Sequence, residues 1–358
     1  MLEANSIAAG VAMIQKATVD EFRQRLSEYL EAVTGQPVDV EKLQTLFYGA
    51  AQESRLVKAE INDIEQSFIL QRDLPFRLDD KALECDQEFR VMKLVHEAGI
   101  STPKPRWYCL EPLILDQPFF MTEYVEGISA GDQVVSLPEL AQARAALPVQ
   151  MGEQLAKIHA IDPSPHKFDF LPHPRTGFSP AQETIAQIRA MILRLGMHNP
   201  VFDFGLRWAQ QNAPKTSKTV FLHGDFRIGN LLVGKKGLTG IIGWEFARMG
   251  DPLEDLAWPC LRHWRYGKGE LQLGGIGKRE PFIQAYEKVS GQTVDREALD
   301  YWEILANLRW AVSYQFQANR NVSGTHPSVE FANRGRRSAE MQLEMLRLIG
   351  AKGLKDDV

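Results

Sequence analysis

The segment 221–258 constrains the fold most, because short apolar runs alternate there with charged residues at fixed offsets. Its sequence is FLHGDFRIGNLLVGKKGLTGIIGWEFARMGDPLEDLAW. The apolar runs 231–233 and 239–242 flank the polar turn GKKG, a pattern that predicts a β-hairpin of two buried strands. Such a hairpin would brace the charged residues that come directly before it.

The residues before the predicted hairpin have the spacing of a phosphoryl-transfer loop. His223, Asp225 and Asn230 form the pattern H-x-D-x-x-x-x-N, which is typical of the catalytic loop of kinases. In that loop the aspartate accepts the proton of the attacking hydroxyl, and the asparagine holds a magnesium ion. The loose transition state mainly requires positioning and charge compensation, so a carboxylate, an amide and a metal suffice.

This segment resembles the aminoglycoside phosphotransferase and choline kinase family, and more narrowly the kinase-like domain of acyl-CoA dehydrogenase fusion proteins. The resemblance rests on HGDFRIGN and on GIIGWEFARMGDPLEDLAW, where the family has I-D-W-E, then G-D-P, then D-L-A. It implies an ATP-dependent phosphotransferase that acts on a hydroxyl of a small molecule, with ATP and Mg²⁺ as cofactors. It also implies that Asp225 is the catalytic base, that Asn230 binds the metal, and that His223 and Asp255 shape the catalytic loop.

One residue departs from the family pattern. The family has a metal-binding aspartate thirteen residues after Asn230, and this chain has Gly243 there. Residues two apart in an extended segment face the same side, so Glu245 is a candidate auxiliary metal ligand. Because the departure removes a charge that would bridge magnesium to the phosphates, a second hypothesis is a catalytically impaired, pseudokinase-like nucleotide-binding protein. A third takes His223 and Asp225 as the metal ligands of a hydrolase.

The resemblance also implies phosphate-binding residues upstream of the loop. A glycine-rich phosphate loop is expected within 40–57, where the chain keeps Gly49, and an ordinary hairpin is the alternative. The expected strand 68–72 has Gln71 where the family has a lysine or arginine. We therefore expect Arg72 to contact the nucleotide phosphates, the alternative being a surface arginine.

Two further positions complete the nucleotide site that the resemblance implies. Glu88, in a helix expected over 81–98, matches the glutamate that pairs with the strand cation, and a solvated helix position is the alternative. The segment 119–127, a buried strand that runs into a connection ending in glycine, resembles the hinge between lobes, where the backbone of about Glu123 to Val125 would bind the adenine edge. The alternative there is a plain core strand.

The pattern along the chain predicts an α+β fold, and the resemblance implies a two-lobe protein-kinase-like arrangement. The N-terminal lobe, 1–124, would hold a leading helix and an antiparallel β-sheet that covers the nucleotide. The C-terminal lobe, 125–358, would be mainly helical and carry the catalytic hairpin and the substrate-binding helices. A capping box at 18–21 predicts that the leading helix begins there and ends near Gly35. Helical spacing also predicts long helices over 296–317 and 328–348.

The composition limits the classes of partner and the compartment that we expect for this chain. The net charge of −5 gives no general attraction for nucleic acid, and no apolar run reaches the roughly 18 to 20 residues that a membrane span requires. The start of the chain has no basic segment of a secretory signal, so we expect a cytoplasmic protein. The three cysteines lack metal-binding spacing and are expected to be reduced thiols. The resemblance suggests hydroxylated acyl compounds as acceptors, while the oligomeric state is not encoded in any motif.

Overall fold

The computed structural model describes residues 18–48, 52–74, 82–166, 168–214, 218–324 and 329–353. By its internal contacts the chain divides into two units, Met1–Phe76 with Arg106–Tyr124, and Arg77–Pro105 with Val125–Val358. Residues 77–105, which the predicted lobe 1–124 includes, thus group with the second unit. The lobe boundaries 1–124 and 125–358 stay a prediction.

The first unit is built on a five-stranded sheet in the order β1-β2-β3-β5-β4. Its strands are β1 (Val38–Tyr48), β2 (Gln52–Ile61), β3 (Ile64–Asp73), β4 (Pro105–Cys109) and β5 (Phe119–Glu123). The neighbouring pairs β1 and β2, β2 and β3, and β3 and β5 are antiparallel. Of the two alternatives for 40–57, the described residues form an antiparallel pair, and Gly49 lies outside them.

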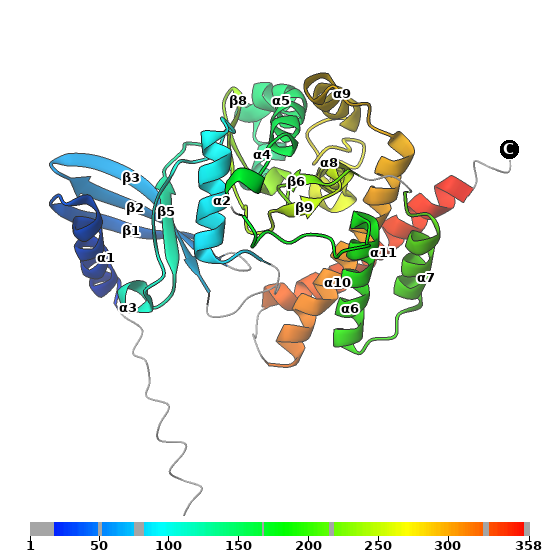
Figure 1. Cartoon of the computed structure of the whole chain (residues 1–358), viewed down its shortest axis with the longest axis horizontal. Coiled ribbons are helices and arrows are strands. Elements are labelled where there is room, and N and C mark those ends of the chain that lie inside the picture. Colours follow the sequence, from blue (N-terminus) through cyan, green and yellow to red (C-terminus); the bar gives the residue numbers. More distant parts are fainter. Residues whose placement is uncertain are drawn as a thin grey trace, which may run out of the picture. The chain divides into compact units, whose positions relative to one another are not determined.

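Helix α1 (Val19–Thr34) covers one face of this sheet, as Figure 1 shows in dark blue. The predicted capping box is confirmed, because the Thr18 side chain accepts from the backbone of Glu21 and the Glu21 side chain accepts from the backbone of Thr18. Gly35 ends the helix in a left-handed conformation. The helix is held to the sheet by a core that joins its buried side chains to those of the strands: Phe22, Leu26, Leu30, Val40, Val57, Ala59, Phe68 and Leu70.

The second unit is mainly helical, as expected. Its helices are α2 (Cys85–Glu97), α4 (Gly131–Ser136), α5 (Ala141–His159), α6 (Pro180–Leu195), α7 (Pro200–Gln211), α8 (Pro252–Ala257), α9 (Arg279–Ser290), α10 (Arg296–Val322) and α11 (Val329–Gly353). Helix α3 (Pro112–Leu115) belongs to the first unit. Helices α10 and α11 pack along each other, and α5 packs against α9.

The long helix α10 has the buried stripe that its sequence predicts. Its apolar residues at helical spacing are almost fully buried: Leu299, Trp302, Leu305, Leu308 and Val312. Burying side chains of this size removes several hundred Å² of apolar surface from water, at about 25 cal/mol per Å². This stripe anchors α10 beneath the short helix α8, which carries the residues that support the candidate site.

Two short two-stranded sheets frame the site in the second unit. Strand β6 (Val220–Leu222) pairs with β9 (Arg248–Gly250), and β7 (Leu231–Gly234) pairs with β8 (Gly237–Ile241). The second pair confirms the predicted hairpin. The loop 223–230 runs from one pair to the other, so both of its ends are fixed by strands.

All three cysteines are buried and none forms a disulfide; Cys109 lies in the first unit, and Cys85 and Cys260 lie in the second. None of the described helices combines the length and the apolar character needed to cross a bilayer.

Candidate active site

The candidate site is the loop 223–230 of the second unit. Its first turn depends on Gly224, which has a φ of +85°. A Cβ at this position would lie 2.0 Å from the carbonyl oxygen of Phe246. Glycine is therefore required both by the backbone conformation and by the close approach of the neighbouring chain.

Asp255 fixes the backbone of this loop from below. Its carboxylate accepts hydrogen bonds from the backbone N–H of His223 at 2.7 Å and of Gly224 at 2.9 Å. His159 Nε2 lies 3.3 Å from the same group. Burial acts to raise the pKa of Asp255, but the hydrogen bond from His159 and nearby basic groups, Arg248 among them, together hold that pKa below its ordinary value. Asp255 lies within the short helix α8.

His223 is fully buried and uses both ring nitrogens within the loop. Nε2 donates to the carbonyl oxygen of Ile242 at 3.1 Å, and Nδ1 accepts from the backbone N–H of Asp225 at 3.2 Å. The ring also packs on Trp244 with centroids 4.4 Å apart. Burial lowers the pKa of His223, so the imidazole is neutral near pH 7. These contacts favour a supporting role and speak against His223 as a metal ligand.

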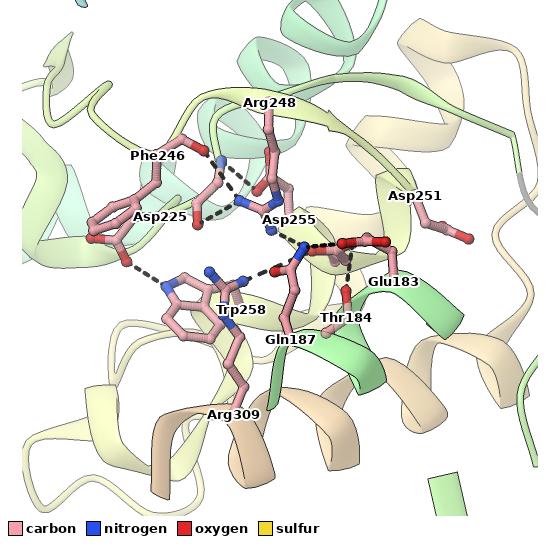
Figure 2. Close-up of polar contacts among 12 residues, drawn as sticks. Glu183, Thr184, Gln187, Asp225, Phe246, Arg248, Asp251, Asp255, Trp258 and Arg309 are labelled. Atoms are coloured by element: carbon pink, nitrogen blue, oxygen red, sulfur yellow. Dashed lines mark hydrogen bonds and ion pairs between the residues drawn. The ribbon is translucent and has the colours of Figure 1, made fainter. Parts of the chain in front are cut away.

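Three side chains hold the carboxylate of Asp225. Trp258 Nε1 donates to Oδ1 at 2.6 Å, and Asn230 Nδ2 donates to Oδ2 at 2.7 Å. Arg227 Nε lies 3.1 to 3.2 Å from both oxygens. Figure 2 shows the indole of Trp258 pointing directly at Asp225. Charge-assisted hydrogen bonds from this many directions fix the rotamer of the carboxylate, as a general base requires.

Asn230 occupies the space next to Gly243. Its Nδ2 also donates to the backbone oxygen of Asp225 at 2.8 Å. A Cβ built on Gly243 would lie 2.9 Å from both Cγ and Nδ2 of Asn230, and Gly243 has a φ of +78°. The amide therefore stands where a side chain at 243 would begin. The backbone there also favours glycine.

Glu245 is a half-buried carboxyl group whose charge acts on Asp225. Burial, and then the negative charge of Asp225, raise the pKa of Glu245 to about 7. Its backbone oxygen accepts from the N–H of Leu83 at 2.7 Å, which ties the segment to the start of α2. In the part of the chain that the structure describes, no three His, Cys, Asp or Glu side chains are grouped closely enough to hold a metal ion.

A second layer of polar contacts supports the loop, as Figure 2 shows. Arg248 donates to the carbonyl oxygens of Gly224 at 3.4 Å and Phe246 at 3.2 Å, and it pairs with Glu254 of α8. The hydroxyl of Thr184 in α6 donates to Glu254 at 3.5 Å. Through this network three separate elements contribute to the position of the loop 223–230.

Sequence reasoning missed Arg227, Trp258 and Arg248. Arg227 stands two residues after Asp225, within hydrogen-bond reach in a tight loop, so its position was an available signal. Trp258 ends the DLAW run, and its contact with Asp225 spans 33 residues. No local pattern encodes that distance, because it arises from the packing of α8 under the loop.

In the first unit, Arg72 is used internally. Its guanidinium bonds to Glu53 at 2.7 and 3.1 Å and to the backbone oxygen of Leu115 at 2.8 Å, and it lies 5.1 Å from the ring of Phe22 in α1. Glu53 is fully buried, and Arg55 also pairs with it. Arg72 shares its sheet face with Phe68 and Leu70, which α1 covers, so the phosphate contact expected of it would require this ion pair to open.

The other predicted nucleotide residues are placed as follows. Gln71 contacts Gln52 at 3.2 Å. Glu123, at the end of β5, pairs with Arg106. Val125 follows in the second unit, where Glu88 is fully buried within α2. Binding of nucleotide by Arg72, Glu88, Glu123, Val125 and Gly49 stays a prediction.

Comparisons with known proteins agree with the fold. In sequence, acyl-CoA dehydrogenase family member 10 of Mus musculus is 28% identical over 210 residues, which are 56% of this chain and 19% of that protein. Acyl-CoA dehydrogenase family member 11 of Rattus norvegicus is 26% identical over 298 residues, 79% of this chain and 38% of that protein. The chain thus spans well under half the length of these two relatives.

Among solved structures, a putative aminoglycoside phosphotransferase from Ralstonia eutropha superposes with a TM-score of 0.68 at 19% identity, covering 91% of this chain and 97% of that one. A choline/ethanolamine kinase family protein from Mesorhizobium loti gives 0.58 at 18% identity, covering 93% and 98%. These likenesses confirm the predicted kinase-like α+β fold. A family model described as "Phosphotransferase enzyme family" matches residues 47–292. Because this match covers more than half of the sequence, the chain belongs to the Phosphotransferase enzyme family.

Proposed function

We propose that this chain transfers the terminal phosphoryl group of ATP to a hydroxyl of a small molecule, with Asp225 as the base. The observation that carries the proposal is the arrangement around Asp225. Its carboxylate is held by Trp258, Asn230 and Arg227, in a loop whose backbone is fixed by Asp255. A rigidly placed carboxylate is the main thing that phosphoryl transfer asks of the protein at the attacking oxygen.

The proposed reaction transfers one proton to Asp225 and one phosphoryl group to the acceptor. The hydroxyl of the acceptor gives its proton to the Asp225 carboxylate as its oxygen attacks the γ-phosphorus of ATP. The bond between that phosphorus and the bridging oxygen to the β-phosphate breaks, and ADP leaves with the electron pair. His223 and Asp255 hold the loop while this happens and do not exchange protons with the acceptor.

Solved relatives of the same fold support the choice of a nucleotide as the phosphate donor. An aminoglycoside phosphotransferase with GDP and kanamycin gives a TM-score of 0.60 at 16% identity. A spectinomycin phosphotransferase with ADP and spectinomycin gives 0.56 at 14%. We extend nucleotide binding to this chain, and we take ATP as the donor.

The residues at the family's metal positions do not fit a magnesium ion in this chain. Mg²⁺ is normally held by carboxylates, but Gly243 has no side chain and its Cβ space is filled by Asn230. The remaining candidates are the neutral amide of Asn230 and Glu245, whose pKa of about 7 leaves it partly protonated at neutral pH. The proposed reaction therefore assigns no step to a metal ion.

A cavity of about 500 Å³ in the second unit is our candidate for the acceptor. Tyr266 lines it, and the charges of Arg227 and Asp225 contribute to the pKa of that phenol, which supports a location near the loop 223–230. Arginines outnumber carboxylates in its wall: Arg262, Arg337 and Arg347 against Glu340 and Glu344.

This lining suits a hydroxylated acyl compound with an acidic end better than a polycationic aminoglycoside. The test is phosphoryl transfer from γ-labelled ATP to a panel of hydroxy acids, their thioesters and aminoglycosides, followed by mass spectrometry. Asp225→Asn is the matched control, because it keeps the shape and removes the base. We expect it to bind ATP while losing about 10²- to 10⁴-fold in rate. Equal transfer rates for Asp225→Asn and the unaltered chain would refute the role of Asp225.

Gly243 favours a second candidate function, a nucleotide-binding protein without turnover. One experiment distinguishes the two candidate functions. A kinase both binds ATP and labels an acceptor, whereas the second candidate binds ATP and labels none, even when the panel is extended to whole metabolite extracts. Absence of ATP binding would sink both.

A further inference from the structure

Arg227 is a cation fixed in place at the centre of the candidate site. Its Nε lies 3.1 and 3.2 Å from the carboxylate oxygens of Asp225. Its Cζ lies 4.7 Å from the ring centroid of Trp264, a cation–π contact that sets the guanidinium plane. The side chain is 25% exposed, so one edge of it reaches solvent.

The two terminal nitrogens of Arg227 donate no hydrogen bond to any residue that the structure describes. The hydrogen bonds of Arg227 to described residues both run from Nε, to the two carboxylate oxygens of Asp225. An arginine held at Nε still offers four N–H groups in a rigid fork, and this fork matches the oxygens of a phosphate.

Gly229 makes room for this fork. A Cβ on Gly229 would lie 2.2 Å from Nη1 of Arg227. The guanidinium thus lies against the loop's own backbone, one residue before Asn230. A side chain at 229 would therefore displace Nη1 of Arg227 without changing the charge of any residue.

The positive charge of Arg227 could also compensate the negative charge of a bound phosphate. The γ-phosphate carries negative charge that a kinase must neutralise, and a metal ion at the family's aspartate normally does so. Here Gly243 cannot hold that ion, whereas Arg227 puts a permanent positive charge in contact with Asp225.

We infer that Arg227 binds the terminal phosphate of the nucleotide through Nη1 and Nη2, and supplies the charge compensation that a metal at position 243 would otherwise provide. The inference rests on the proposed function, because it requires that ATP binds. It places the phosphate beside Asp225, where the acceptor hydroxyl must lose its proton.

The experiment is isothermal titration of ATP and adenosine into the full chain and into Arg227→Gln, Arg227→Lys and Gly229→Ala, in the presence of magnesium and of a chelator. Arg207→Gln, at an exposed arginine of α7, is the matched control. Circular dichroism checks that each variant is folded. Gly229→Ala tests the idea without changing a charge, should Arg227→Gln fold poorly.

We expect Arg227→Gln and Gly229→Ala to weaken ATP binding by about 10- to 100-fold, the size of charge-assisted hydrogen bonds, and to leave adenosine binding unchanged. Arg227→Lys should retain part of the affinity. Removing magnesium should change ATP affinity of the unaltered chain by less than about tenfold.

Two results would overturn the inference alone: full ATP affinity in both Arg227→Gln and Gly229→Ala, or a parallel loss of ATP and adenosine that marks Arg227 as structural. A strict requirement for magnesium would do the same. Failure of the unaltered chain to bind ATP would instead remove the proposed function, and the inference with it.

Discussion

The indole nitrogen of Trp258 donates a hydrogen bond of 2.6 Å to Oδ1 of Asp225, joining the residue after α8 to the centre of the catalytic loop. Both groups are buried. Helix α8 therefore acts on the loop twice, through Asp255 on its backbone and through Trp258 on its carboxylate. Disturbing either contact should alter the orientation of Asp225 without touching a ligand directly.

Replacing Trp258 with phenylalanine removes this donor and keeps most of the ring. We expect the free energy of unfolding to fall by about 1–3 kcal/mol, because the carboxylate loses a charged hydrogen bond in a buried place. In a kinase assay kcat should fall while KM for ATP changes little. Urea unfolding and steady-state kinetics measure the two effects. Trp208→Phe, in α7 away from the loop, is the control, and an unchanged kcat in Trp258→Phe would contradict the positioning role.

Gly243→Asp should not simply restore a metal site. The φ of +78° strains any L-residue, and the new Cβ would meet the amide of Asn230 at 2.9 Å. We expect a loss of about 1–3 kcal/mol in the free energy of unfolding. Gly243→Ala has the same backbone cost without the carboxylate, so the difference between the two variants isolates the effect of the charge. A Gly243→Asp variant as stable as the unaltered chain would show that Asn230 moves freely.

The carboxyl group of Glu245 should make stability depend on pH. Its pKa is raised from 4.5 to about 7, so the folded chain binds this proton more tightly than the unfolded chain does. The contribution of Glu245 to stability is therefore greatest below about pH 4.5 and falls as the pH rises to 7. We expect Glu245→Gln to gain about 1–2 kcal/mol relative to the unaltered chain at pH 8, after allowance for solvent screening, and little at pH 5.

Urea unfolding at these two pH values tests the prediction for Glu245. Glu139→Gln, at an exposed site, is the control and should change stability equally at both. A gain that is the same at pH 5 and pH 8 in Glu245→Gln would argue against a raised pKa.

Breaking the buried ion pair of the first unit should lower the free energy of unfolding markedly. Glu53→Gln leaves Arg72 and Arg55 without their shared carboxylate in a place that α1 covers. We expect the free energy of unfolding to fall by about 3–5 kcal/mol. Glu65→Gln, which breaks the exposed pair with Lys58, should cost less than about 1 kcal/mol. Comparable losses in the two variants, measured by thermal unfolding, would count against a structural role for Glu53.

Features encoded by neighbouring residues were predictable from the sequence. The capping box at Thr18 and Glu21, the hairpin β7–β8 and the buried stripe of α10 each depend on residues within a few positions of one another. The spacing of Asp225 and Asn230 likewise fixed the location of the candidate site, because both lie in one short loop.

What escaped prediction depends on which face of an element is covered. The ion pair of Arg72 with Glu53 is one example, because Phe68 and Leu70, on the same face of β3, pack under α1. The phosphate contact of Arg72 itself stays a prediction. Nothing in the strand pattern states which face a distant helix will cover. The contact of the Asn230 side-chain amide with Gly243 is a similar case, because the glycine is the only sign of it in the sequence.

The contact between Asn230 and position 243 also makes a substitution at either position unfavourable. A single substitution to aspartate meets both a backbone penalty and the amide already in place. A prior change at Asn230 would clear the space, but it would release the clamp on the Asp225 carboxylate. Whichever of the two positions changes first, the singly substituted chain loses stability or the contact that holds Asp225. The geometry of these two residues therefore disfavours a stepwise change from Gly243 to aspartate.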